Sequence, residues 1–525
     1  GSVYSNNSVD FDSNNSYAVA LRSSYVNKIY YDPTVRYQPW SNADGSLMAN
    51  ALITCAPHNP TNTGAGCRDL TTNNTQTAGW LNSDGTLSAS VSKTFYPAVY
   101  YSYQSGSIWD VNSYTKVEIK SSTATYTGGV KRTDCASALT CSYAEEIQNF
   151  ANWYTYYRSR VLLARAGIGK AFAAQGSNMR VGFGAINKGN TSIDDVMAYT
   201  IIRGVRPFTS SNKSTFFSDL YNHPIYTYGT PLRWALDDVG RYFQRTDDKG
   251  PWGENPGSTG GTQYVCRQNY NILMTDGYWN DGFSGVGNAD NTDGSSISND
   301  TPNVAPATFK YTPALPYSDS FSDTLADVAM HYWKTDLRTN LANKVPTNSK
   351  DPAFWQHLVN FTVGLGVNGT LTELPSGAGA WPNPTASDGA KIDDLWHAAV
   401  NSRGEFFSAQ DPTEFATGLS EVLNNIAART SSAAAVTTNT SRLNSGTRIY
   451  QAKFNSSDWS GQLLSYNLNS DGSIGTTQWE ASAVMPAHAS RKIFTYNGTG
   501  GVAFTTSNFS LLSSAQQNSL NTNIG

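Results

Sequence analysis

The sequence predicts an α/β fold built on a doubly wound, mostly parallel sheet. Helix-like and strand-like segments alternate between residues 143 and 430, which is the order that a parallel sheet with crossover helices requires. A short apolar run over residues 270–274 leads directly into Thr-Asp-Gly, as a buried parallel strand does where it enters a loop. These two observations predict one α/β core across residues 143–430.

The first elements of this core are a helix and two strands. From Tyr143 onward, apolar residues recur at helical spacing, which predicts one long amphipathic helix that ends near Gly176. The apolar runs at residues 179–186 and 198–205 are short and bounded by turn residues, so both are expected to be strands.

The later elements are mainly helices. The sequence Thr230-Pro231-Leu232 opens a helix, because proline suits the first helical position. Further helices are expected at residues 323–337 and 391–400, with an apolar segment between them. The last helix begins at Asp411, where Asp-Pro-Thr-Glu is a variant of the capping box.

The regions on either side of the core have a different character. Residues 1–142 are rich in turn residues with short aromatic and β-branched runs, which indicates an irregular, β-containing insertion that belongs to the α/β domain. Residues 431–441 are rich in Ser, Ala and Thr and are expected to form a linker. Residues 442–525 alternate like strands, with a hairpin signal at Asp471-Gly472. This segment is too short to close into a propeller of several four-stranded blades.

Composition excludes some functions and favours a compartment. Only 14% of the 525 residues are charged and the formal net charge is -4, so no positive field attracts a phosphate backbone, and nucleic acid is not an expected partner. The sequence contains no apolar run long enough to cross a membrane, so no membrane span is expected. The abundance of Ser, Thr, Asn, Gly and Tyr is typical of an extracellular protein.

Five cysteines occur, and four of them form two closely spaced pairs in turn-rich sequence. Local disulfides are therefore expected between Cys55 and Cys67 and between Cys135 and Cys141. A zinc site is the alternative, but the sequence has no C-x-x-C motif and only one histidine at ligand spacing from a cysteine. For Cys266, either the partner lies outside this chain or the thiol is buried.

Thr230 and Asp276 are the candidate metal ligands. In an open parallel sheet, ligands bind beyond the carboxyl ends of the strands, and Asp276 directly follows a predicted strand. A hydroxyl and a carboxylate on neighbouring loops supply the oxygen donors that a hard divalent cation needs. Two simpler interpretations stay open at this point: Thr230 as a helix N-cap and Asp276 as a turn residue before Gly277.

The motifs around both residues resemble those of known domains. Thr230-Pro231-Leu232 and Met274-Thr275-Asp276-Gly277 resemble the second and third motifs of a metal-ion-dependent adhesion site in von Willebrand factor A domains. Segments spread between residues 23 and 463, including 392–399 and 458–463, resemble the PilC/PilY family of type IV pilus tip adhesins. The resemblance implies a von Willebrand factor A-like core followed by the start of a β-propeller.

The first motif of that adhesion site, D-x-S-x-S, has no strict match in the chain. The nearest approach begins at Asp84 in turn-rich sequence with no apolar strand before it, which favours a plain turn. Residues 23–33 resemble a family segment that lies shortly after the first motif, so the chain is expected to begin just past it. We therefore expect weak or absent cation binding by this chain alone.

By resemblance, the expected function is that of a cell-surface adhesin at the type IV pilus tip, which supports pilus biogenesis and attachment through a metal-assisted ligand site. The implied cofactor is a divalent cation, Mg, Mn or Ca. The implied partners are minor pilins or the pilus tip complex, together with a host or surface ligand. The implied location is the bacterial cell surface or the pilus tip.

Two alternatives to this function stay open: a secreted glycan-binding or glycan-cleaving protein, and a structural minor pilus component that binds no ligand. An enzyme is not expected, because the sequence has no H-E-x-x-H, G-x-S-x-G or P-loop motif. The neighbouring acids Asp237-Asp238 and Asp393-Asp394 lie on predicted helices, where adjacent side chains point apart, so neither pair suits acid/base catalysis.

Two further features contain side chains that are able to bind a metal ion. The Asp/Asn-rich loop at residues 288–294 offers oxygens for calcium, but its spacing does not fit an EF-hand, and a solvated turn is the favoured interpretation. His397 lies on a predicted helix, where a packing or capping role is expected more often than a ligand role.

Overall fold

The computed structural model describes residues 15–521 except residues 83, 85, 226–228, 303, 377–379, 410, 432–435, 439–447, 456–459, 469–473 and 488–489. The chain divides into two compact units, residues 1–426 and 427–525, and each is described by itself. The hairpin expected at Asp471-Gly472 and most of the linker expected at 431–441 lie outside the described residues. The domain boundaries expected from the sequence stay predictions.

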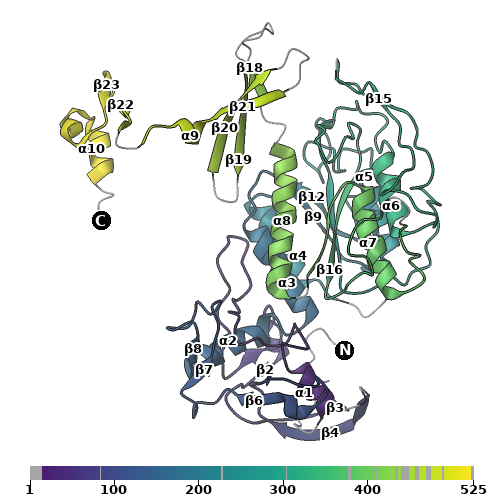
Figure 1. Ribbon diagram of the computed structural model, residues 1–525, viewed down its shortest axis with the longest axis vertical. Coiled ribbons are helices and arrows are strands. Elements are labelled where there is room, and N and C mark those ends of the chain that lie inside the picture. Colours follow the sequence, from purple (N-terminus) through teal and green to yellow (C-terminus); the bar gives the residue numbers. More distant parts are fainter. Residues whose placement is uncertain are drawn as a thin grey trace. The chain divides into compact units, whose positions relative to one another are not determined.

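The first unit contains a parallel sheet of three strands, ordered β13-β16-β17. Figure 1 labels the central strand, β16. Ile272 lies opposite Phe361 in the first pair, and Thr362 lies opposite Phe406 in the second. The strand expected at residues 270–274 is therefore present. The strands are β13 (Tyr270–Thr275), β16 (Val359–Leu365) and β17 (Phe406–Ala409).

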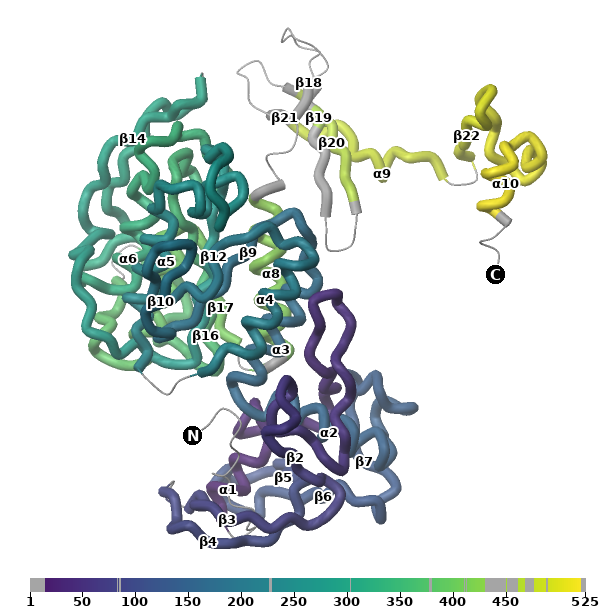
Figure 2. Tube along the Cα trace, turned by 180° about the vertical axis from the view of Figure 1, so that it is seen from behind, coloured from purple at the N-terminus to yellow at the C-terminus, as the bar shows by residue number. Residues whose placement is uncertain are grey.

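Helices cover both faces of this sheet, as Figures 1 and 2 show from opposite sides. Ile272 and Val363 belong to a hydrophobic core with one set of helices, whereas Leu273, the neighbour of Ile272, belongs to a core with the other set. This alternation follows from the period of two along a strand. The first set is α3 (Arg160–Ala173), α4 (Ser210–Asn222) and α8 (Pro412–Ser431). The second set is α5 (Leu232–Phe243), α6 (Leu325–Lys334) and α7 (Asp388–Asn401).

The long helix expected from Tyr143 to Gly176 is in fact two helices, so that prediction is wrong. The helix α2 (Tyr143–Tyr156) begins at a capping box between Ser142 and Glu145. It ends at Tyr156, with Tyr157 as the C-cap. The Ser159 side chain then accepts a hydrogen bond from the Leu162 backbone N–H at the start of α3. The apolar periodicity continues across this short break, and periodicity alone therefore does not reveal it.

The two strands expected after α3 are present, but they pair with each other. β9 (Arg180–Gly184) and β12 (Ile201–Pro207) form an antiparallel pair with register shifts. Among the described residues, this pair shares no backbone ladder with the β13-β16-β17 sheet. Two small antiparallel pairs complete the core: β10 (Thr191–Ile193) with β11 (Val196–Ala198), and β14 (Ile297–Ser298) with β15 (Thr308–Phe309).

The region before α2 consists of short antiparallel pairs joined by long loops. It contains α1 (Ser16–Leu21), β1 (Ala56–Pro57), β2 (Cys67–Arg68), β3 (Asn74–Leu81), β4 (Leu87–Phe95), β5 (Val99–Tyr103), β6 (Tyr114–Glu118), β7 (Thr125–Thr127) and β8 (Thr140–Ser142). Side-chain and backbone groups of α2 hold these loops. The Asn149 side chain accepts from the Tyr37 backbone N–H at 2.7 Å, and the Tyr156 carbonyl accepts from Trp40 Nε1 at 2.9 Å. The region thus packs on α2.

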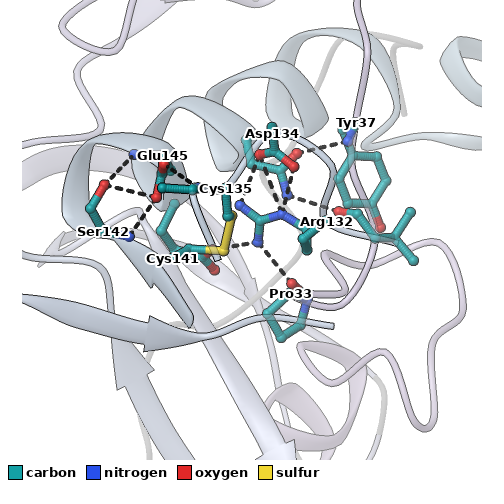
Figure 3. The surroundings of a disulfide bond; sticks show 12 residues. Pro33, Tyr37, Arg132, Asp134, Cys135, Cys141, Ser142 and Glu145 are labelled. Atoms are coloured by element: carbon teal, nitrogen blue, oxygen red, sulfur yellow. Dashed lines mark hydrogen bonds and ion pairs between the residues drawn. A yellow bond between two sulfur atoms is a disulfide. The ribbon is translucent and has the colours of Figure 1, made fainter. Parts of the chain in front are cut away.

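Both expected disulfides are confirmed. Cys55 is bonded to Cys67 and Cys135 to Cys141. Figure 3 shows the second bond beside Arg132, whose guanidinium is directed toward Asp134. Cys266 is a free thiol and is exposed, so the alternative that it is buried is wrong.

The second unit contains an open antiparallel sheet of four strands, ordered β18-β19-β20-β21. Its strands are β18 (Val436–Thr438), β19 (Arg448–Asn455), β20 (Ser460–Leu468) and β21 (Ile474–Glu480). They are followed by α9 (Ala481–Val484), β22 (Phe494–Tyr496), β23 (Gly501–Ala503) and α10 (Ser514–Asn521). Within the described part of the chain, no helix has both the length and the apolar character needed to cross a bilayer.

Candidate functional site

Asp276 begins the loop at the carboxyl end of β13. The strand ends at Thr275, whose hydroxyl accepts a hydrogen bond from the Gly277 backbone N–H at 3.2 Å. This tight turn leaves the Asp276 side chain 53% exposed. The carboxylate is therefore presented at the edge of the sheet where ligands of parallel sheets gather.

Thr230 lies against the same loop. Its backbone N–H donates to Asn280 Oδ1 at 2.6 Å, and its carbonyl accepts from the Asn280 backbone N–H at 3.2 Å. Helix α5 starts after Pro231 without a side-chain cap, so Thr230 is not the helix N-cap that the simpler interpretation expected. The structure thus brings the two predicted loops into contact. The assignment of Thr230 and Asp276 as metal ligands stays a prediction.

An arginine lies next to the Asp276 carboxylate. Arg160, the first residue of α3, has Nη1 3.5 Å from Asp276 Oδ2 and 3.4 Å from the Asp276 carbonyl oxygen. Both side chains are about half exposed, and an exposed ion pair contributes only about 0–1 kcal/mol. This contact is therefore weak enough for a divalent cation to displace it.

Arg233 of α5 holds the loop after Asn280 in place. Its guanidinium stacks 3.9 Å from the ring centroid of Trp279, and Nε lies 3.2 Å from Asp281 Oδ1. Its Nη1 also donates to the Asp323 carbonyl at 2.9 Å. No local sequence pattern indicates this role, because the partners are 46 to 90 positions away from Arg233 along the chain.

The carboxylates of Asp393 and Asp394 on α7 engage different partners, as expected for neighbours on a helix. Asp393 accepts from the backbone N–H of Thr370 at 3.0 Å, which fixes the loop after β16. Asp394 accepts from the backbone N–H groups of Leu325 and Ala326, both at 3.0 Å. Burial raises the pKa of Asp394 to about 6, although these hydrogen bonds oppose the rise. Both carboxylates hold structure together rather than face each other.

A second cluster of ligand-type side chains lies in the interior, where Asp290, Asp319 and His397 place one ligand atom each within 4.8 Å of one another. The prediction of a solvated turn at residues 288–294 is wrong for Asp290, which has no exposed surface. Its carbonyl accepts from the Tyr311 hydroxyl at 2.6 Å, so segments distant in sequence cover it. The three residues come from three separate segments, and no local spacing reveals them.

The expected packing role of His397 agrees with its surroundings. The imidazole stacks on Trp381 with ring centroids 4.2 Å apart and an interplanar angle of 13°. Sequence reasoning did not anticipate that two carboxylates also flank this ring.

Comparison with known proteins finds three relatives, each named type IV pilus biogenesis factor PilY1 and each from Pseudomonas aeruginosa. The relative from strain PAK is 33% identical over 479 residues, which covers 81% of this chain and 38% of the relative. The relative from strain PAO1 is 33% identical and covers 72% of this chain and 36% of its own length. The relative from strain UCBPP-PA14 is 32% identical, and the match covers 92% of this chain and 43% of the relative.

The chain therefore spans less than half the length of the relatives it matches. No family model and no solved structure matches it.

Proposed function

This chain belongs to the PilC/PilY family, and we propose that it supports type IV pilus biogenesis as an adhesin on the cell surface or at the pilus tip. The observation that carries this proposal is the similarity to three pilus biogenesis factors over 72–92% of the chain. The proposed partners are minor pilins or the pilus tip complex, and a host or surface ligand. No catalytic role is part of the proposal.

The proposed fold of residues 143–430 is von Willebrand factor A-like. Three parallel strands with helices on both faces support it, as does the position of Asp276 at the carboxyl end of β13. The antiparallel sheet of the second unit, with four strands in sequence order, is the size of one propeller blade and supports the proposed start of a β-propeller.

The proposed ligand site uses a divalent cation held by Thr230 and Asp276. Contact between their loops, through paired hydrogen bonds between Thr230 and Asn280, supports this assignment. Hydroxyl and carboxylate oxygens suit Mg²⁺, Mn²⁺ or Ca²⁺. Because two residues supply few ligands, binding by this chain alone is weak, and the full-length protein is the appropriate material for a test.

Substitution of Asp276 by alanine tests the site. We expect Asp276→Ala in the full-length protein to weaken Mg²⁺ binding by at least about tenfold, because the variant loses a charged oxygen ligand. Calorimetric titration measures the affinity, and surface attachment of cells that carry the variant measures adhesion.

Asp293→Ala is the matched control, since its carboxylate is similarly half exposed and pairs only with Lys310 among the ion pairs of the described residues. Equal Mg²⁺ affinity in the wild-type protein and both variants would show that Asp276 is a turn residue. Normal attachment by Asp276→Ala cells would favour a structural component of the pilus without a ligand site.

A further inference from the structure

We propose that Asp290, Asp319 and His397 form a second, buried metal site that takes Zn²⁺ or a similar transition-metal ion. The site uses none of the residues assigned to the Thr230–Asp276 site, and its donor chemistry differs. It does not rest on the proposed adhesive function.

The three ligands converge from different parts of the first unit. Asp290 lies in the loop after β13, Asp319 lies in the segment between β15 and α6, and His397 lies on α7. Their side chains are 0%, 3% and 1% exposed. Solvated acidic turns do not have this burial, so the carboxylates need a compensating partner inside the protein.

The separations between the ligand atoms suit an ion. His397 Nδ1 lies 3.5 Å from Asp319 Oδ2, and His397 Nε2 lies 3.6 Å from Asp290 Oδ2. Both distances exceed those of normal nitrogen–oxygen hydrogen bonds. Tetrahedral zinc, with bonds of about 2.0–2.2 Å, sets neighbouring ligand atoms roughly 3.3–3.6 Å apart. A single ion binds one of the two ring nitrogens, so only one of these separations bears directly on coordination. As a set, one ligand atom from each residue lies within 4.8 Å of the others, which is close enough for small side-chain shifts to bring all three onto one ion.

The imidazole is already oriented for this role. Trp381 stacks on the ring, and His397 Nε2 lies 3.0 Å from the Tyr317 carbonyl oxygen. Whichever ring nitrogen binds the ion, the other is directed toward an oxygen of Asp319, Asp290 or Tyr317. A metal-ligating histidine commonly has such a partner for its second nitrogen, which fixes the ring.

A neighbouring amide fixes one of the carboxylates. Asn401 Nδ2 donates to Asp290 Oδ2 at 3.0 Å and to the Ala326 carbonyl at 3.2 Å, which fixes the orientation of the amide. Asn401 itself has no exposed surface, and its Oδ1 atom has no hydrogen-bond partner in the described structure. The Asp290 carboxylate is therefore held in place beside His397 before any ion binds.

The buried groups around the cluster include several carboxylates, whose negative charge favours a bound cation. The Asp327 carboxylate accepts the Asp290 backbone N–H at 3.2 Å, so a third buried acid borders the cluster. The nearby Lys334 ammonium donates to the carbonyls of Ala289 and Thr292, and no ion pair joins it to Asp290 or Asp319 among the described residues. Among the ion pairs of the described residues, His397 is therefore the cationic partner of both carboxylates, while Lys334 acts on Asp290 without forming an ion pair with it.

The donor set selects the class of ion. One imidazole nitrogen with two carboxylates suits Zn²⁺ and its transition-metal neighbours, whereas Ca²⁺ and Mg²⁺ prefer oxygen ligands throughout. Bound there, the ion would join α7 to the two loops that precede α6. We therefore assign it a structural role.

Metal analysis of the full-length protein tests the site. We expect about one zinc ion per chain to survive dialysis against Mg²⁺ and Ca²⁺, and Co²⁺ to replace it with a visible absorption spectrum of a nitrogen- and oxygen-ligated ion. His397→Gln and Asp290→Asn should weaken Zn²⁺ binding by more than about tenfold. Asp276→Ala should retain the zinc, which separates this site from the proposed adhesion site.

The wild-type measurement alone is decisive if the variants fail to fold. A wild-type protein that binds neither Zn²⁺ nor Co²⁺ would overturn the proposal and leave the cluster as a buried histidine flanked by two acids. Unchanged zinc affinity in a folded His397→Gln protein would also overturn it. Loss of zinc in Asp276→Ala would contradict the separation of the two sites.

Discussion

At the scale of single residues, buried charges in this protein have specific partners. Glu146 of α2 has no exposed side-chain surface and lies between Arg132 and Tyr31. Arg132 Nη1 is 2.6 Å from one carboxylate oxygen, and the Tyr31 hydroxyl donates to the other at 2.8 Å. Arg132 also donates to the Pro33 carbonyl at 2.8 Å, as Figure 3 shows. This network joins the insertion to α2.

Replacement of Glu146 by glutamine should destabilise the first unit by about 3 kcal/mol, because it leaves the Arg132 guanidinium buried with one charged partner fewer. Urea denaturation followed by tryptophan fluorescence measures the loss. Glu118→Gln is the control: the Glu118 carboxylate pairs with Lys116 and Lys120 at the surface, and its loss should change stability by less than about 1 kcal/mol. Similar losses in the two variants would show that the buried network contributes no more than a surface pair.

At the scale of elements, one helix caps another. The Asp394 carboxylate on α7 accepts from the first two backbone N–H groups of α6 and from Trp279 Nε1 at 3.0 Å. The four N–H groups at the start of a helix have no partner within the helix, and an anion there is favourable. Asp394 therefore positions α6 against α7 and against the loop that carries Asn280.

Asp394→Ala should destabilise the fold by about 3 kcal/mol, since three buried donors lose their acceptor. Asp394→Asn keeps one carbonyl oxygen and should lose less. Chemical denaturation gives both values. Asp388→Ala, at the exposed start of α7, removes a carboxylate 64% exposed and should cost under about 1 kcal/mol. The interpretation fails if Asp394→Ala behaves like this control.

Element prediction from the sequence succeeded where a pattern is local and failed where it is not. The apolar run at β13, the helix after Pro231 and the two short disulfides each depend on neighbours in sequence, and each is present. The break between α2 and α3 has no local signal beyond Ser159, because the apolar face continues through it. The buried environment of Asp290 depends on residues more than 100 positions away, such as Asn401, and only the folded chain reveals it.

At the scale of the whole molecule, histidine protonation couples stability to pH. Burial lowers the pKa of His58 to about 4, and it lowers the pKa values of His223 and His331 below 6.5. At each of these three histidines, the unfolded chain binds more protons than the folded protein at pH values below about 6.5. The free energy of unfolding therefore rises as the pH rises toward neutrality. His357 behaves in the opposite way.

Burial and the nearby Arg403 charge disfavour the imidazolium form of His357. The Asp351 carboxylate 2.8 Å away and the Trp355 carbonyl favour it more strongly, so the pKa of His357 is raised above 6.5. Its contribution to stability is therefore complete below about pH 6.5 and disappears as the pH rises through the raised pKa. For Asp351, burial also opposes ionisation, yet His357 and the hydrogen bonds from Trp333 and Ala353 lower the pKa below 3.8. Its contribution is lost only as the pH falls through that lowered value.

His357→Gln should therefore destabilise the protein by about 1–3 kcal/mol at pH 5.5, and by progressively less as the pH rises through the raised pKa of the wild-type imidazole. Denaturation curves of both proteins across this pH range measure the difference. Because the other histidines are unchanged in the variant, their titrations cancel in the comparison. A difference in stability that grows as the pH rises would show that His357 is not the protonated partner of Asp351.

Cys266 is the exposed free thiol of a chain whose other four cysteines are joined in disulfides. A thiol-selective reagent that reacts with free thiols and leaves disulfides intact therefore has one attachment point in this chain, without any substitution. A fluorophore or spin label placed there would lie shortly before β13, the strand that leads to Asp276. The native chain is thus ready for site-specific spectroscopy at the amino end of β13, across the length of the strand from its proposed ligand site.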